Sequence, residues 1–110
     1  MSAGRVRQEA QTPEHTFTPS LGSVVIAVVS AGWAFVGRLA VETNEYIRLD
    51  HAANIRQWGT TRGLGELALT GPLKATVLDP VGSTWIQRSH LLFILPCKSA
   101  TWAVWQERCE

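Results

Sequence analysis

The run Val24–Val29, VVIAVV, constrains the fold more than any other part of the sequence. It holds six apolar residues, most of them β-branched, between Gly22 and the turn residues 30–32. Such a short apolar run is typical of a β-strand that is covered on both faces. It is far shorter than the roughly 20 residues that a transmembrane helix needs. The chain is therefore expected to build a sheet around this first strand.

The residues after this strand continue the β pattern. Residues 34–41 alternate between two faces, and Gly37 in the middle predicts the sharp bend that a small barrel requires. Residues 42–45, ETNE, form a polar hairpin connection. Residues 46–50 return as a strand, and residues 51–58 continue the extended chain through a kink or bulge.

The last third of the folded chain again favours β-strands, and its final residues favour a helix instead. Residues 83–88 and 91–95 are predicted strands, and residues 89–90 between them form a tight turn, a 3₁₀ step or a bulge. Residues 98–110 favour a short helix in which Trp102 and Trp105 share one face, against the barrel or a neighbouring subunit. The fold class is thus mainly β, a small five-stranded barrel with a central insertion and a short C-terminal helix.

Length and composition limit the organisation to one domain. The 110 residues are 45% hydrophobic and 17% charged, which allows a packed core. Residues 1–20 are expected to be a flexible arm, residues 21–97 the barrel with an insertion at 58–81, and residues 98–110 the C-terminal helix or tail.

Charge and cysteine content exclude several functions. A formal charge of +1 disfavours binding to a long nucleic acid. The two cysteines, Cys97 and Cys109, form neither a disulfide framework nor a metal-ligand spacing, so no metal site is expected. Residues 1–20 contain no apolar segment of the secretory kind. The sequence therefore predicts a soluble cytoplasmic protein without a membrane partner.

The stretches GSVVIAVVSAGWAFVGRLAVETNEYIRLDHA and STWIQRSHLLFIL resemble small SH3-like or Sm-like barrels. Gly32, Gly37 and Leu39 stand where Sm-like proteins have a glycine and then a hydrophobic-x-G-x-L run. The turn at 42–45 departs from that family's usual Asp/Asn pair, and RSHL at 88–91 lacks its Ile-Arg-Gly type signature. The resemblance implies an oligomeric barrel, with a ring that binds a short single strand of RNA as one functional alternative.

The central segment, residues 58–80, looks like one in small uncharacterised proteins of bacterial viruses and prophages, which share a WGTTxGLGELA…GP…TVLDP string. Small phage barrels that oligomerise often act in counter-defence by sequestering nucleotide immune signals of the host. By analogy, this resemblance implies a homo-oligomeric phage protein of the host cytoplasm that holds a small phosphorylated ligand.

The same segment contains the parts of an anion and base cradle. Glycines let backbone N–H groups approach a ligand, hydroxyls and guanidinium groups bind phosphate, and a tryptophan stacks on a base. The candidate ligand-binding residues are Trp58, Gly59, Thr60, Thr61, Arg62, Gly63, Lys74 and Arg56. The structural alternative is an ordered loop that joins subunits, with Trp58 buried and Arg62 paired with Glu66 or Asp79.

Catalysis finds little support in the sequence. His15, His51 and His90 are scattered, and no serine or cysteine nucleophile is paired with a base in a recognisable pattern. We therefore expect no catalytic residues, no cofactor and no enzymatic activity. A ligand-free virion or structural component is the remaining alternative.

Overall fold

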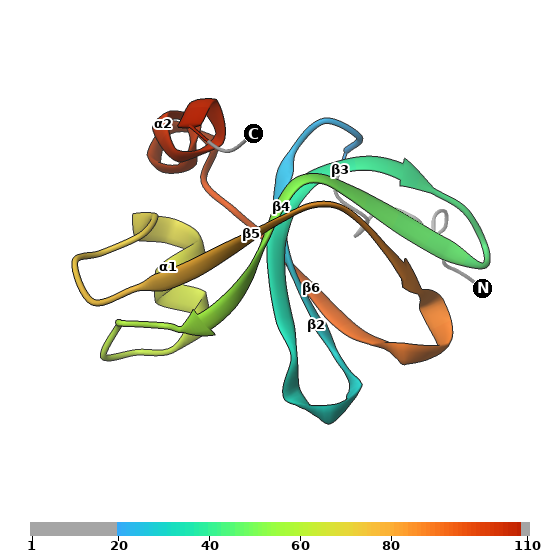
Figure 1. The fold of residues 1–110 in the computed structure, drawn as a ribbon, viewed down its shortest axis with the longest axis horizontal. Coiled ribbons are helices and arrows are strands. Elements are labelled where there is room, and N and C mark those ends of the chain that lie inside the picture. The colour runs from blue at the N-terminus through green and yellow to red at the C-terminus, as the bar shows by residue number, and fades with distance from the viewer. Residues whose placement is uncertain (1–19, 109–110) are drawn as a thin grey trace, which may run out of the picture.

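Residues 20–108 are described by a computed structural model, and they form one bent antiparallel sheet with two α-helices at one end (Figure 1). The elements are β2 (Val24–Val29), η2 (Ser30–Gly32), β3 (Ala34–Glu42), β4 (Tyr46–Gln57), α1 (Leu64–Thr70), β5 (Val77–Gln87), η3 (Arg88–His90), β6 (Leu91–Pro96) and α2 (Ser99–Arg108). The expected five strands and C-terminal helix are confirmed. The predicted N-terminal arm and Cys109 lie outside the described residues.

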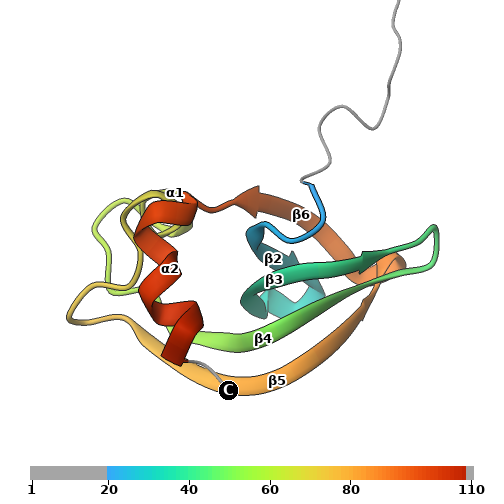
Figure 2. The ribbon, with the colours of Figure 1, turned by 90° about the horizontal axis from the view of Figure 1, so that it is seen from above.

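The strand order in the sheet is β5-β4-β3-β2-β6, and every neighbouring pair is antiparallel. Only η3 separates β5 from β6 along the chain, although these are the two outermost strands. The sheet therefore curls until its two edges meet at the η3 corner. Figure 2 shows β4 and β5 curving beneath β2 and β3.

The strand β2 is buried on both faces, as its apolar run predicts. Alternate residues point to opposite sides of a strand, so the two faces enter two separate clusters. Val25, Ala27 and Val29 pack inside the curled sheet with side chains such as Leu39 and Ile47. The even-numbered residues of β2 pack on the other face, against α1 and α2.

Two local features bend the long strands. A Cβ atom on Gly37 would lie 3.0 Å from the Cβ atoms of both Leu49 and Ala52, so glycine lets β3 and β4 approach more closely here than a larger residue would. In β4, His51 adopts a φ of 50°, and the pairing with β5 shifts between Leu49 and Ala52. An irregularity of this kind increases the local bend of a strand. The predicted bend at Gly37 and the predicted kink after residue 50 are both present.

The helices α1 and α2 form a cap over the outer cluster. Trp102 of α2 is fully buried in that cluster, and its Nε1–H donates to the carbonyl oxygen of Ala68 in α1 at 3.1 Å. Trp105 packs edge-on against Trp102, with ring centroids 5.5 Å apart. The two tryptophans share one face as expected, and that face packs on the domain itself. Neither α-helix within residues 20–108 is long and apolar enough to cross a membrane.

The strand β5 begins at Val77, earlier than the predicted end of the insertion at residue 81. Pro80 and Gly82 lie inside this strand, and because both residue types are typical of loops, the sequence here resembles a loop. Proline is tolerated because β5 is an edge strand, where its missing N–H faces away from the ladder. The non-strand part of the insertion is therefore residues 58–76.

Candidate nucleic-acid interface

A pocket of about 420 Å³ lies at the end of the molecule farthest from the helical cap. It forms where the β3–β4 turn meets η3, because the start of β4 pairs with the end of β5 and Tyr46 lies opposite Gln87. The backbone N–H of Arg88 donates to the carbonyl oxygen of Glu45 at 2.9 Å and joins the two turns. The lining residues are Asn44, Glu45, Tyr46, Gln87, Arg88 and Ser89.

The β3–β4 turn is fixed by the side chain of Thr43. Its hydroxyl oxygen accepts hydrogen bonds from the backbone N–H groups of Glu45 and Tyr46, at 3.1 and 3.0 Å. The hydroxyl in turn donates to the carbonyl oxygen of Tyr46 at 3.1 Å. A short polar side chain that satisfies the backbone in this way stabilises a tight turn. The turn therefore presents Asn44 at an ordered, exposed tip.

Arg88 links the pocket wall to the neighbouring strand. Its guanidinium donates to the carbonyl oxygen of Thr43 at 2.7 Å and to the carboxylate of Glu42. These contacts leave the guanidinium part-exposed at the pocket, with its charge largely balanced. Because Glu45 adds a negative charge to the same wall, the pocket is poorly suited to phosphate alone. Its amide, hydroxyl and ring groups suit the polar edges of a nucleobase better.

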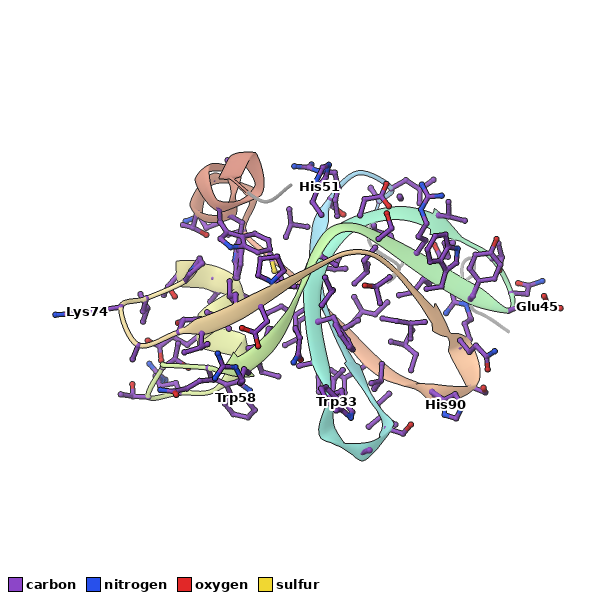
Figure 3. All side chains as sticks on the ribbon, in the orientation of Figure 1. Trp33, Glu45, His51, Trp58, Lys74 and His90 are labelled. Carbon is purple, nitrogen blue, oxygen red and sulfur yellow. The ribbon has the colours of Figure 1, made fainter. Side chains whose placement is uncertain are left out.

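The predicted cradle lies at the opposite end of the molecule, as the labels of Trp58 and Lys74 against Glu45 show in Figure 3. Arg56 is the residue before the end of β4, and it forms two hydrogen bonds to the carboxylate of Asp79, at 2.8 and 3.2 Å. This hydrogen bonding lowers the pKa of Asp79 and raises the pKa of Arg56. Both side chains are largely exposed, so the pair adds little to stability.

The cradle hydroxyls bond within their own loop. Thr60 donates to the carbonyl oxygen of Gly63 at 2.7 Å, and Thr61 donates to the carboxylate of Glu66 at 3.4 Å. The same carboxylate accepts the backbone N–H of Arg62 at 2.8 Å. The structural alternative expected the charge of Arg62 to pair with Glu66 or Asp79. The contact with Glu66 is instead made by the Arg62 backbone N–H, and Asp79 pairs with Arg56.

The glycines of the segment serve close contacts within the chain. Gly59 has a φ of 71°, and a Cβ there would lie 2.3 Å from the backbone nitrogen of Thr76. The hydroxyl of Thr76 donates to the carbonyl oxygen of Trp58 at 2.6 Å, which closes the base of the insertion. The ring of Trp58 lies beside Gly63 and remains 46% exposed, so it is not buried as the structural alternative expected.

The predicted residues do not all lie together in the described part of the chain. Arg62 lines a separate hollow of about 320 Å³ with Glu66, Leu69 and Thr70. Lys74 is exposed at the tip of its loop, and in Figure 3 its side chain points away from Trp58. Within residues 20–108, no group of three histidine, cysteine or acidic side chains is placed to hold a metal ion.

The pocket at Asn44 and Arg88 was missed as a site from the sequence. The sequence predicts residues 42–45 only as a polar hairpin connection and residue 88 only as the end of a strand. The signal that could locate this pocket is the order in which the strands pair. If β4 and β5 pair in antiparallel fashion, the turn before β4 must lie beside the turn after β5.

No protein-family model and no curated protein matches the sequence. Solved structures do match the fold. One is a heptameric archaeal Sm protein, with 18% sequence identity, a TM-score of 0.50, and coverage of 72% of this chain and 91% of that chain. Another is the SmAP1 heptamer of P. aerophilum, with 18% sequence identity, a TM-score of 0.50, and coverage of 72% of this chain and 84% of that chain. At this identity the likeness establishes a shared Sm-like fold.

Proposed function

We propose that this chain forms a homo-oligomer that binds a short single-stranded RNA through the pocket at the β3–β4 turn and η3. The observation that carries the proposal is the pocket itself, where Asn44 of the β3–β4 turn meets Gln87 at the end of β5 and Arg88 of η3. Its polar groups match those that bind unstacked bases of single-stranded RNA, which are recognised on their edges and faces. The proposal describes a binding protein without catalytic activity.

Support for an oligomer comes from the two edges of the sheet. In the part of the chain that the structure describes, β5 pairs only with β4, and β6 pairs only with β2. Val81 on β5 is 48% exposed, and Leu92 on β6 is 62% exposed. Unpaired strands with exposed apolar side chains favour pairing with another chain. Head-to-tail pairing of β5 with β6 of the next copy would cover every edge once a ring closes. The two archaeal neighbours are heptamers.

Charge favours a short strand over a long one. The formal charge is +1, and the pocket holds Arg88 beside Glu42 and Glu45. Affinity must therefore come from bases bound at repeated pockets and not from a continuous run of phosphate contacts. If each engaged pocket contributes one phosphate contact, the salt slope rises by about 0.7 per pocket.

Fluorescence anisotropy with short labelled homopolymers of RNA tests this function. Asn44→Ala removes an exposed amide from the pocket, and we expect about a fivefold loss of affinity, the size of one hydrogen bond of about 1 kcal/mol. Lys74→Ala, which removes an exposed cation at the opposite end, is the matched control and should leave binding unchanged. Absent RNA binding, or equal effects of the two variants, would contradict the proposal.

Sequestration of a small nucleotide by residues 58–74 is the second candidate function. It is supported by the half-exposed ring of Trp58 and by the exposed side chains of Arg62 and Lys74. The internal bonds of Arg56, Thr60 and Thr61 leave fewer groups for a ligand than the sequence indicated. Trp58→Ala combined with Arg62→Ala should abolish nucleotide binding if this candidate is right. Phage origin and a location in the host cytoplasm stay predictions.

A further inference from the structure

A second hollow, of about 270 Å³, adjoins the proposed RNA pocket, and we call it the aromatic slot. Phe35 and Trp85 line it together with the apolar side chains of Val29 and Ile86. Gln87 lines both the aromatic slot and the pocket at the β3–β4 turn. The two cavities are therefore neighbours on one surface.

We propose that the aromatic slot binds a second base of the same RNA strand, with the first base in the pocket at Asn44 and Arg88. This inference rests on the proposed function and adds to it the path of the strand. The ligand class is a single strand of at least two nucleotides, whose second base enters an apolar, aromatic site.

The composition of the aromatic slot suits a flat aromatic ring. Phe35 is backed by the ring of Trp33, whose centroid lies 6.4 Å away at an interplanar angle of 13°. Trp33 is 54% exposed, so the stacked pair extends as a platform beyond the slot. Three polar side chains at the slot can hydrogen-bond to a base edge: Thr84, Gln87 and His90. Aromatic platforms with a few polar groups are the usual means of binding unpaired bases.

Hydrogen bonds hold the two cavities in a fixed relation. The N–H of Arg88 to the carbonyl of Glu45 fixes η3 to the β3–β4 turn. At the other end of η3, Nδ1 of His90 lies 3.2 Å from the hydroxyl oxygen of Ser30 in η2. Trp33 follows η2 directly. In Figure 3 the labelled residues Glu45, His90 and Trp33 accordingly follow one another around one side of the molecule.

The charges around the aromatic slot predict how the second base contributes. Arg48 lies over the ring of Trp85 at 5.8 Å, and its guanidinium forms two hydrogen bonds to Asp50. The cation that lies over Trp85 is thus balanced by a carboxylate. The second base should therefore add affinity by stacking, with almost no change in salt dependence.

The experiment measures binding of a uridine mononucleotide and a uridine hexanucleotide to the full chain and its variants. Trp85→Leu and Trp33→Ala should each weaken hexanucleotide binding about tenfold, the effect of losing one stacked base. Both should leave mononucleotide binding within about twofold, a change too small for the loss of a direct contact. Trp58→Ala is the matched control, an exposed tryptophan at the opposite end that should have no effect.

The outcomes separate this inference from the proposed function. If wild-type protein binds neither ligand, the proposed function fails and the inference fails with it. If Asn44→Ala weakens binding while Trp33→Ala and Trp85→Leu do not, the function stands and the inference is wrong. If Trp85→Leu changes the assembly mass in light scattering and leaves RNA affinity unchanged, the slot holds a neighbouring subunit, which also overturns the inference.

Photochemical cross-linking gives a readout that does not depend on the folding of a variant. A hexanucleotide containing 5-iodouracil at one internal position is irradiated with wild-type protein, and the linked peptide is identified by mass spectrometry. Cross-links to Trp33, Phe35 or Trp85 support the inference. Cross-links only to the segment around Trp58 contradict it.

Discussion

Replacing Trp102 with alanine should destabilise the protein more than any change to an exposed tryptophan. Its side chain is fully buried between α1 and the outer face of the sheet. Loss of a buried tryptophan costs about 3–5 kcal/mol, and the indole hydrogen bond to Ala68 adds about 1 kcal/mol. A domain of this size has about 5–15 kcal/mol of stability, so Trp102→Ala should lose a large part of it.

A graded pair of variants separates packing from hydrogen bonding at this site. Trp102→Phe retains much of the apolar contact and removes the indole donor. The Ala68 carbonyl also accepts the backbone N–H of Lys98 at 2.9 Å, so it keeps one partner in this variant. We therefore expect Trp102→Phe to cost about 1–2 kcal/mol. Trp33→Ala is the exposed control and should cost less than about 1 kcal/mol.

Urea unfolding followed by far-ultraviolet circular dichroism measures these differences at one fixed protein concentration, because assembly also affects stability. With a slope of about 2 kcal/mol per molar urea, Trp102→Ala should lower the midpoint by about 2–3 M. The reasoning is refuted if Trp102→Ala and Trp33→Ala shift the midpoint equally. That result would mean that α2 does not contribute to the core.

Two further predictions concern glycine and cysteine positions in the cap. Gly71→Ala should cost about 2 kcal/mol in urea unfolding, because φ is 79° and the new Cβ would lie 2.5 Å from the carbonyl oxygen of Thr101. Gly65→Ala, with open space around it in α1, should instead gain up to about 1 kcal/mol, and a loss of stability in both variants would contradict this account. Burial raises the pKa of the Cys97 thiol from 9.0 to about 12, so its contribution to stability is complete below pH 9 and is lost as the pH rises toward 12. In a Cys109→Ser background, alkylation of Cys97 by iodoacetamide at pH 8 should be much slower in native than in urea-unfolded protein, and equal rates would contradict the burial.

The sheet could be predicted from the sequence because its signals are local. The apolar run of β2, the alternation in β3 and the position of Gly37 each depend on neighbouring residues alone. The start of β5 could not be predicted, because Pro80 argues against a strand unless it lies on an edge or at an irregularity in the pairing. Which strand forms an edge depends on the whole sheet.

The candidate site also combines local features, which the sequence reveals, with long-range contacts, which it does not. Residues 58–63 are rich in glycine and hydroxyl groups, which is typical of a ligand loop, but the structure uses most of these groups for contacts within the chain. The partner of Arg56 is Asp79, 23 residues away, on the adjacent strand. The pocket at Asn44 and Arg88 unites residues more than 40 positions apart through strand register. Long-range pairing therefore determines both what the insertion does and where the pocket forms.

The closed base of the insertion has a consequence for how such proteins can diverge. The backbones of Gly59 and Thr76 are in close contact, and the Thr76 hydroxyl donates to the carbonyl oxygen of Trp58. The two ends of the insertion are therefore held together at its base. For a loop whose ends are already fixed, doubling its length costs only about 0.6 kcal/mol of closure entropy. Homologues should therefore differ in the length and sequence of the loop at residues 72–75, while they keep α1, Gly59, the threonine hydroxyl and the bent sheet unchanged.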